Sequence, residues 1–177
     1  YGFSPDGARL LFPLNGELFL YDLGADETQQ ANRVRKLTNK ALGFATEAKV
    51  SPKGNYVSFV RNQNLWAIEL KTDRSIQLTT DGVAKFNLQW LSDGNTLLYM
   101  SGKTVKTVDV ESLREEVIFN FISAEYFESF SVSPDGTQAA LVINRELYVV
   151  PFDLEKLKST SKKSGLLDMK GCLFYNE

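Results

Sequence analysis

Short runs of apolar residues alternate along the chain with polar turn residues, and one turn pattern returns at regular intervals. It is a tetrapeptide that ends in glycine and follows an apolar residue. The four copies are Phe3-Ser-Pro-Asp-Gly7, Val50-Ser-Pro-Lys-Gly54, Trp90-Leu-Ser-Asp-Gly94 and Val132-Ser-Pro-Asp-Gly136. Their glycines lie 47, 40 and 42 residues apart, and the eleventh and sixteenth residues after each glycine are apolar. A recurrence that stays in register without gaps indicates an internal repeat.

Each part of the repeat has a physical interpretation. Proline presets φ near −65° and glycine accepts positive φ, so the tetrapeptide predicts a tight turn between antiparallel strands. The run that follows, for example residues 56–60, is rich in β-branched and aromatic residues and favours a buried strand. A second turn then leads into a second strand, and a third and a fourth strand complete the unit. Four strands in about 40 residues are typical of a propeller blade.

The sequence therefore predicts an all-β fold, a β-propeller of four-stranded antiparallel blades. Four blades are present, and we expect them to be part of a larger propeller. A β-sandwich is the alternative, but a sandwich does not require one sequence to recur every 40 or so residues.

The repeats divide the chain into segments. We expect four propeller repeats at residues 1–43, 44–84, 85–126 and 127–152, with the first blade lacking an innermost strand because only Tyr1-Gly2-Phe3 precede its turn. Residues 153–164 are interpreted as a polar insertion or linker, either one or two helical turns or a charged loop. Residues 165–177 are expected to begin a further blade. The first residue is Tyr1 and no signal-type segment precedes the first strand, so we expect a piece of a longer precursor.

Composition excludes several classes of function. The chain has 20 basic and 22 acidic residues and no basic run, which argues against a nucleic-acid partner. Its longest apolar runs, such as residues 139–143, are too short to span a membrane. It contains no histidine and one cysteine, Cys172, so the usual catalytic triads and common zinc sites cannot form from these residues alone. We therefore predict no catalytic machinery, metal or cofactor within the chain, and its status as an enzyme stays open.

Two sets of recurring acidic residues have structural explanations. The turn aspartates accept hydrogen bonds from nearby backbone amides, and Lys53 at the same position in the second copy argues against a metal array. These aspartates are Asp6, Asp93 and Asp135. The other set, Asp22, Glu69 and Asp109, is interpreted as solvated strand ends.

One repeat position carries aromatic side chains that are candidates for binding a partner. Phe19, Trp66 and Tyr148 occupy it, with Lys106 in the third copy. Packing between blades is the structural interpretation, and a binding platform is the functional one. A lysine cluster within residues 156–163 is interpreted as a flexible insertion.

The repeat resembles the propellers of the TolB proteins, the tricorn proteases and the prolyl oligopeptidase family. It is most similar to bacterial members of the dipeptidyl peptidase IV type, through residues 3–23, residues 57–66 and Leu78-Thr-Thr-Asp-Gly82. In that family a helix with a glutamate pair is associated with gripping the N-terminus of the substrate. Here Val83-Ala-Lys-Phe86 runs directly into the third repeat, so the helix is missing. The pair Glu115-Glu116 is expected to begin an exposed outer strand instead.

The resemblance implies a non-catalytic propeller segment that acts as a protein- or peptide-interaction scaffold. The alternative is a substrate-gating propeller of a dipeptidyl peptidase IV-like or tricorn-like serine peptidase whose hydrolase domain lies outside these residues. A structural domain of a surface assembly is a third hypothesis. The expected partner is a protein or peptide, with a second chain covering open blade edges. The resemblance favours a periplasmic or extracellular location and leaves a cytoplasmic one open.

Overall fold

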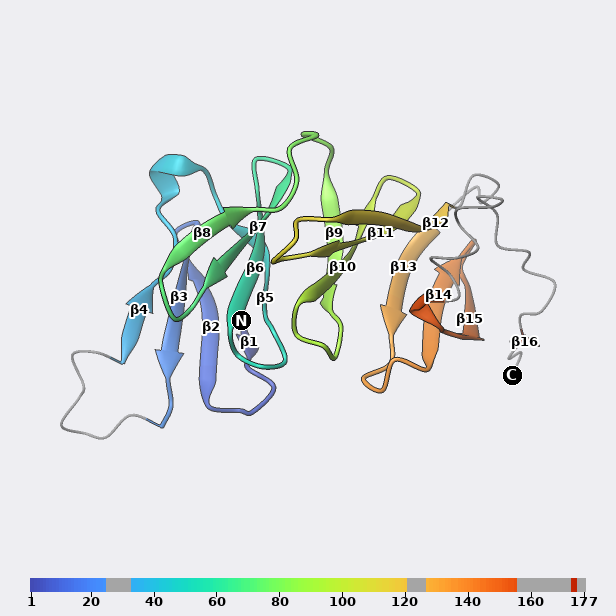
Figure 1. Ribbon diagram of the computed structural model, residues 1–177, viewed down its shortest axis with the longest axis horizontal. Helices are drawn as coiled ribbons and strands as arrows, with labels where there is room; N and C mark the ends of the chain where they lie inside the picture. Colours follow the sequence, from blue (N-terminus) through green and yellow to red (C-terminus); the bar gives the residue numbers. More distant parts are fainter. Residues whose placement is uncertain (25–32, 121–126, 156–172, 175–177) are drawn as a thin grey trace.

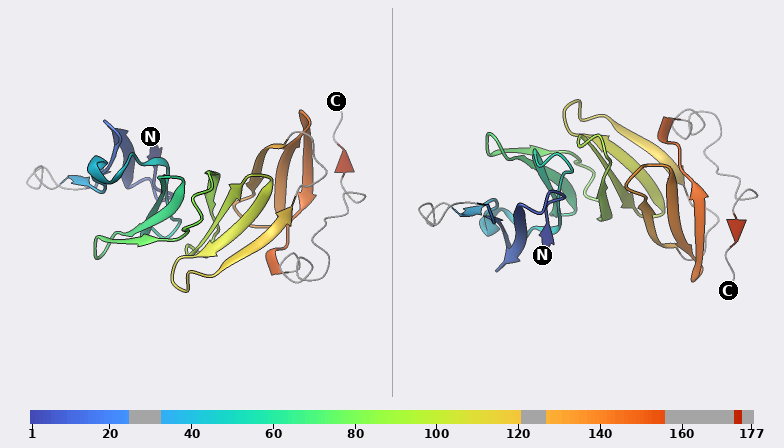
Figure 2. Two further views of the ribbon diagram at one scale, coloured as in Figure 1. Left: turned by 90° about the horizontal axis from the view of Figure 1, so that it is seen from above. Right: turned by 90° about the horizontal axis from the view of Figure 1, so that it is seen from below.

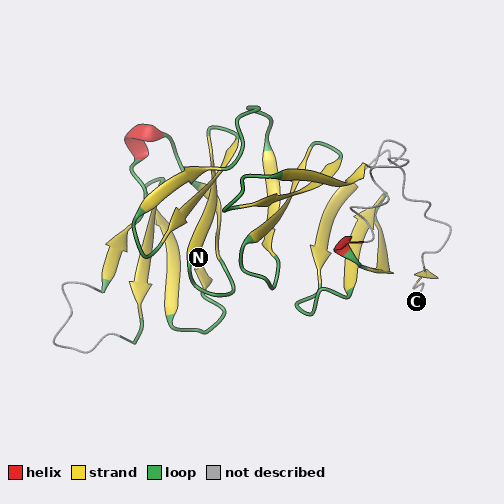
Figure 3. Cartoon of the chain, viewed as in Figure 1, coloured by secondary structure: helices red, strands yellow, loops and turns green. Residues whose placement is uncertain are grey.

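The computed structural model describes residues 1–24, 33–120, 127–155 and 173–174. These residues form four antiparallel sheets of four strands, and strands that are consecutive in the chain are neighbours in each sheet. Figure 3 shows that strands dominate the described chain and that helices are limited to short pieces. The prediction of an all-β propeller with four-stranded antiparallel blades is confirmed.

The strand bounds are as follows. Blade 1 contains β1 Gly2–Phe3, β2 Arg9–Leu14, β3 Glu17–Asp22 and β4 Val34–Lys36. Blade 2 contains β5 Thr46–Val50, β6 Tyr56–Arg61, β7 Asn64–Glu69 and β8 Arg74–Gln77, and the 3-10 helix η2 Lys40–Leu42 precedes it. Blade 3 contains β9 Lys85–Trp90, β10 Thr96–Ser101, β11 Thr104–Asp109 and β12 Glu115–Asn120. Blade 4 contains β13 Phe127–Val132, β14 Gln138–Ile143, β15 Glu146–Pro151 and β16 Leu173–Phe174.

The first strand of each blade is the innermost one. Strand β5 lies against β1 and β9, and β9 lies against β13, so these four strands follow one another across the molecule. Figures 1 and 2 show the blades in chain order, from the blue first sheet to the orange fourth sheet. Each inner strand pairs with its own blade on one side only.

The glycine-ended turns form as the sequence predicts. The amides of Gly7, Gly54, Gly94 and Gly136 donate to the carbonyl three residues earlier, and all four glycines have φ between 68° and 75°. The turn aspartates accept backbone amide hydrogen bonds. Asp6 accepts from Ala8 at 3.0 Å, and Asp135 accepts from Thr137 at 3.1 Å. The hydroxyls of Ser4 and Ser133 donate to these aspartates as well, and the hydroxyl bonds, together with the amide bonds, lower the pKa of both carboxyl groups.

The hydrophobic core lies in the seams between neighbouring blades. The first seam packs Leu11, Leu18 and Leu20 of blade 1 against Val57 and Phe59 of blade 2. The second and third seams are built in the same way from buried residues of blades 2 and 3 and of blades 3 and 4. Blades 2 and 3 are therefore stabilised chiefly by burying both faces against their neighbours, whereas the described residues cover blades 1 and 4 with a neighbouring blade on one face only.

The two ends of the chain differ from the sequence expectation. Blade 1 has a short innermost strand, because Gly2 pairs with Leu11 and Phe3 with Leu10. Near the other end, β16 pairs with β15 through Phe174 and Leu173, so it forms the outer edge of blade 4 instead of opening a further blade. Both pairings satisfy backbone groups of strands that would otherwise be open edges. The rest of the expected insertion and further blade, residues 156–172 and 175–177, lies outside the described residues.

Within the described ranges, no helix is both long enough and apolar enough to cross a membrane.

Candidate binding groove along the inner strands

A shallow groove of about 360 Å³ crosses the inner strands of blades 2, 3 and 4. Its lining comes from β5, β9 and β13 and from the Ser-Pro turns of blades 1 and 2. The lining residues are Pro5, Lys49, Val50, Pro52, Asn87, Leu88, Gln89, Trp90, Phe130 and Ser131. We call this the inner-strand groove.

Side-chain amides of β9 bind the neighbouring inner strand as another strand would. Gln89 accepts from the amide of Val132 at 2.8 Å and donates to the carbonyl of the same residue. Asn87, which has a φ of 58°, donates to the carbonyl of Phe130 at 2.7 Å. These bonds join β9 to β13 across the groove wall, although the two strands belong to different sheets.

On its other side β9 is joined to blade 2 by Trp90. The indole is only 7% exposed and stacks on Tyr56, with ring centroids 6.1 Å apart and an interplanar angle of 17°. Its Nε1 donates to the backbone carbonyl of Lys49 at 3.3 Å. Because β9 is bonded in both directions, the three strands that line the groove are held at a fixed separation.

The accessible groups of the groove suit binding better than bond cleavage. Lys49 is exposed and is the one charged side chain in the lining, while Pro5 and Pro52 offer apolar rings. Ser131 is exposed, and no carboxylate or imidazole lines the groove to act as its base. Across the described ranges, no group of three or more His, Cys, Asp or Glu residues is placed to hold a metal ion.

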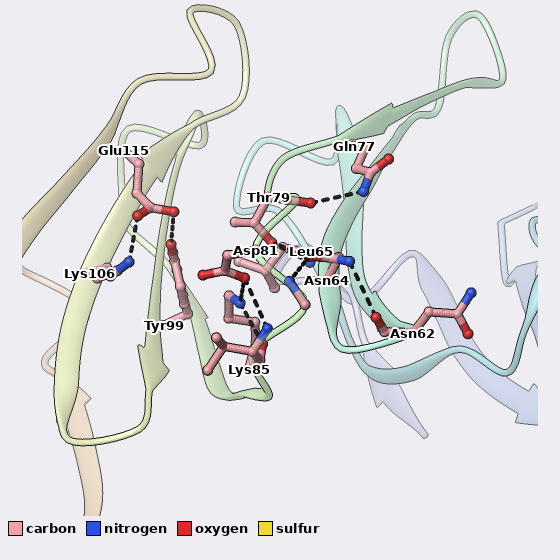
Figure 4. A network of polar contacts seen from close by, with 12 residues as sticks. Asn62, Asn64, Leu65, Gln77, Thr79, Asp81, Lys85, Tyr99, Lys106 and Glu115 are labelled. Carbon is pink, nitrogen blue, oxygen red and sulfur yellow. Dashed lines mark hydrogen bonds and ion pairs between the residues drawn. The ribbon is translucent and has the colours of Figure 1, made fainter.

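The connection that leads into β9 contains an ion pair between a buried lysine, Lys85, and an exposed carboxylate, Asp81 (Figure 4). The side chain of Lys85 has no solvent exposure, and its ammonium donates to the carboxylate of Asp81 and the carbonyl of Val83. The bond from Lys85 lowers the pKa of Asp81, which keeps the carboxylate ionised. Residues 78–84 contain no helix, as the sequence of this segment predicts.

Asn64 fixes the same connection from blade 2. Its Oδ1 accepts from the amide of Gly82 at 3.1 Å and from the hydroxyl of Thr79 at 3.4 Å. The Thr79 hydroxyl in turn accepts from the amide of Leu65 at 3.0 Å.

The two glutamates at the start of β12 do not converge. Glu115 accepts from the hydroxyl of Tyr99 at 2.5 Å and from the ammonium of Lys106 at 2.6 Å. Burial and this carboxylate raise the pKa of Tyr99. Glu116 forms an ion pair with Arg114 at 2.9 Å. Since successive strand residues point to opposite faces, the two glutamates make separate contacts on the two faces of β12, which they begin as expected.

The candidate aromatic residues lie in three different sheets. Trp66 packs against the core of the first seam and Tyr148 against that of the third. Phe19 stacks on Phe12 with ring centroids 5.7 Å apart. The structure does not bring these side chains together, and their role in binding a partner stays a prediction.

Sequence reasoning missed Arg61, the last residue of β6. This residue is 6% exposed, and its guanidinium lies 4.0 Å from the ring centroid of Trp66 and 5.5 Å from that of Phe59. Burial lowers the pKa of Arg61. Its spacing of two from Phe59 could have placed both side chains on one strand face. The two-residue hairpin between β6 and β7 places Phe59 opposite Trp66, but the strand pattern does not show that Arg61 is buried on that face.

The four antiparallel four-stranded sheets, which follow one another with their inner strands side by side and their cores in the seams, define this protein as a β-propeller. The family model described as the dipeptidyl peptidase IV (DPP IV) N-terminal region matches residues 4–94, just over half of the chain. The chain therefore belongs to this family.

Solved structures show the same fold. Dipeptidyl peptidase 4 from Porphyromonas gingivalis is 15% identical with a TM-score of 0.66, and the match covers 88% of this chain and 31% of that one. TolB from Acinetobacter baumannii is 16% identical with a TM-score of 0.63, covering 85% of this chain and 40% of that one. An oligogalacturonate lyase in complex with manganese is 15% identical with a TM-score of 0.59, covering 76% and 39%. The chain thus spans between about a third and two fifths of the length of these proteins.

Proposed function

We propose that this chain is a non-catalytic propeller segment that binds peptides or extended segments of proteins in the inner-strand groove. The observation that carries the proposal is the groove itself, about 360 Å³ of open space across three adjacent inner strands. The groove presents proline rings, an aromatic edge and one cation on strands whose inner edges have no partner within their sheets.

An extended peptide fits this chemistry. Extended peptides bind through main-chain hydrogen bonds to strand edges and through pockets for alternate side chains. Because Gln89 and Asn87 already bond the backbone of β13 at Val132 and Phe130, side-chain contacts would carry the binding at that wall of the groove. The rings of Pro5 and Pro52 would contact apolar side chains of the peptide. Lys49 would attract a carboxylate, either a side chain or the peptide's C-terminus.

A second candidate function is favoured by the family match. In this alternative, the segment is part of the propeller that admits or orients peptides for a dipeptidyl peptidase IV-like or tricorn-like serine peptidase. The hydrolase domain would lie outside these 177 residues. Both candidates place binding, and not chemistry, in this chain. Both also agree with a periplasmic or extracellular location, which cell fractionation would test.

Tryptophan fluorescence offers a direct test, because the chain has two tryptophans and Trp90 lines the groove. In a Trp66→Phe variant, Trp90 is the single reporter. We expect a panel of short peptides containing proline and acidic residues to include members that change its emission saturably. Lys49→Gln should weaken these peptides, whereas Lys40→Gln, which removes an exposed charge outside the groove, should not.

The absence of any saturable change across the panel would contradict the proposal. Equal weakening by Lys49→Gln and Lys40→Gln would also contradict it, because it would show that net charge and not the groove attracts the peptides. Peptidase activity in the product of a longer gene that contains this segment would favour the second candidate.

A further inference from the structure

A second cavity, separate from the groove, lies at the outer part of the first seam. Its volume is about 370 Å³, and its lining includes four cationic side chains, Arg9, Arg33, Arg35 and Lys71, and one carboxylate, Asp22. The turn at residues 51–54 separates the two sites, since Pro52 lines the groove and Gly54 lines this cavity. We call it the basic pocket.

The strand pattern explains why these cations gather. Arg35 lies in β4 and Arg33 directly precedes that strand, and both side chains line the cavity. Arg9 begins β2 of the same blade, and Lys71 follows β7 of the next blade. The seam between blades 1 and 2 therefore brings together cations from strands that are far apart in the sequence.

Backbone and side-chain acceptors hold the arginines in place without using all their donors. Arg9 Nη1 donates to the carbonyl of Gly54 at 3.0 Å, and Arg35 Nη1 donates to the carbonyl of Leu70 at 2.7 Å. Arg35 also forms an ion pair with Asp73. A guanidinium has five N–H donors and stays protonated in proteins, so Arg9 and Arg35 keep further donors for a ligand.

We propose that the basic pocket binds a small multivalent oxyanion of the phosphate or carboxylate class. The lining carries four positive charges against one negative charge, and an excess of two positive charges remains when Asp73 is counted as the counter-ion of Arg35. The carboxylate of Asp22 already accepts from the amide of Gly24 at 3.0 Å. Arginine forks match the geometry of two oxygens on one phosphorus or carbon. The volume is large enough for pyrophosphate or a tricarboxylate. This inference is independent of peptide binding in the groove.

Calorimetric titration with pyrophosphate and with citrate at constant ionic strength tests the pocket, with chloride as the reference anion. We expect saturable binding of one oxyanion per chain. Arg9→Gln and Lys71→Gln should each weaken it about tenfold, the loss of a charge-assisted contact. Asp22→Asn should tighten binding because it removes the repelling charge. Preference for pyrophosphate or for citrate would identify the phosphate or the carboxylate source.

The matched control is Arg145→Gln, which removes an exposed arginine of blade 4 and changes the net charge equally. It should leave affinity unchanged. Lys71→Gln keeps the test valid if Arg9→Gln loses the Gly54 contact and unfolds, because Lys71 is exposed. Equal weakening by Arg145→Gln, unaltered affinity in Lys71→Gln, or no saturable binding of either oxyanion would overturn the proposal.

Discussion

Blades 1 and 2 place an aromatic ring at the same repeat position but in different surroundings. Phe19 and Trp66 each lie opposite another aromatic residue on the neighbouring strand, Phe12 and Phe59 respectively. Trp66 faces blade 1 and packs against the core of the first seam. Phe19 faces the side of blade 1 on which the described residues place no further blade. A repeated aromatic thus becomes a core residue where a preceding blade covers it.

Two buried cations, Lys85 and Arg61, also differ in the groups that replace their hydration. In the second seam, Lys85 is neutralised by a carboxylate, Asp81. In the first seam, Arg61 lies on the rings of Trp66 and Phe59, and the ion pairs of the described residues do not include it. The weaker hydration of a guanidinium suits it to an aromatic environment that an ammonium would tolerate less well.

The largest expected effect separates the two aromatic positions. Trp66→Ala should lower the free energy of unfolding by about 3–5 kcal/mol, because it opens a cavity in the seam and removes the ring beneath Arg61. Phe19→Ala should lower it by about 1 kcal/mol, mainly through the lost ring pair. Urea denaturation monitored by circular dichroism measures both. Equal losses would show that the free face of blade 1 is covered, for example by a second chain or by further blades of a longer protein.

The next effect tests the ion pair of Asp81 with the buried Lys85. Asp81→Asn leaves the ammonium of Lys85 without its counter-ion and should lower the free energy of unfolding by about 2–3 kcal/mol, less than for a wholly buried pair. The carboxylate is 39% exposed, so water can partly replace it. Glu69→Gln is the matched control, because its ion pair with the exposed Arg74 is long, at 3.8 Å, and glutamine can still accept the hydrogen bond from the hydroxyl of Thr72. That control should change stability by about 0–1 kcal/mol, and a similar loss in both variants would show that Lys85 is not held by Asp81.

A smaller effect is expected when only the indole nitrogen is removed. The Nε1 of Trp66 is buried and has no hydrogen-bond partner within the described residues. Trp66→Phe keeps an aromatic ring beside Arg61 but removes this unsatisfied donor. Removal of the donor stabilises the fold by about 1–3 kcal/mol, which offsets the packing energy that the smaller ring loses. We expect a change in unfolding free energy below about 1 kcal/mol. A loss as large as that of Trp66→Ala would mean that the indole N–H has a partner in solution.

Much of the fold could be predicted from the sequence because its determinants are local. The glycine of each turn requires positive φ, and the strands follow at fixed distances from it, so counting from Gly7 or Gly54 locates β2, β3, β6 and β7. The groove could not be predicted in this way. It depends on side chains such as Gln89 that reach a strand of the next blade, 43 residues further along the chain. The burial of Arg61 depends in the same way on blade 1, and a strand pattern does not show which face will meet which neighbour.

The smallest expected effect is a change in the thermal stability of the glycine-ended turns as pH falls. Asp6 has a lowered pKa because the hydroxyl of Ser4 and the amide of Ala8 donate to it, whereas the equivalent residue of blade 2 is Lys53. A carboxyl whose pKa is lower in the folded state contributes stability above its unfolded pKa, near 3.8, and loses it as pH falls through the folded value. Asp6→Asn should therefore have a lower Tm than the parent at pH 7, and the difference should shrink below pH 4 and vanish in stronger acid. Asp135→Asn, with the same serine and amide bonds in blade 4, should behave alike. A difference that persists unchanged at pH 2 would show that the turn depends on the shape of the side chain and not on its charge.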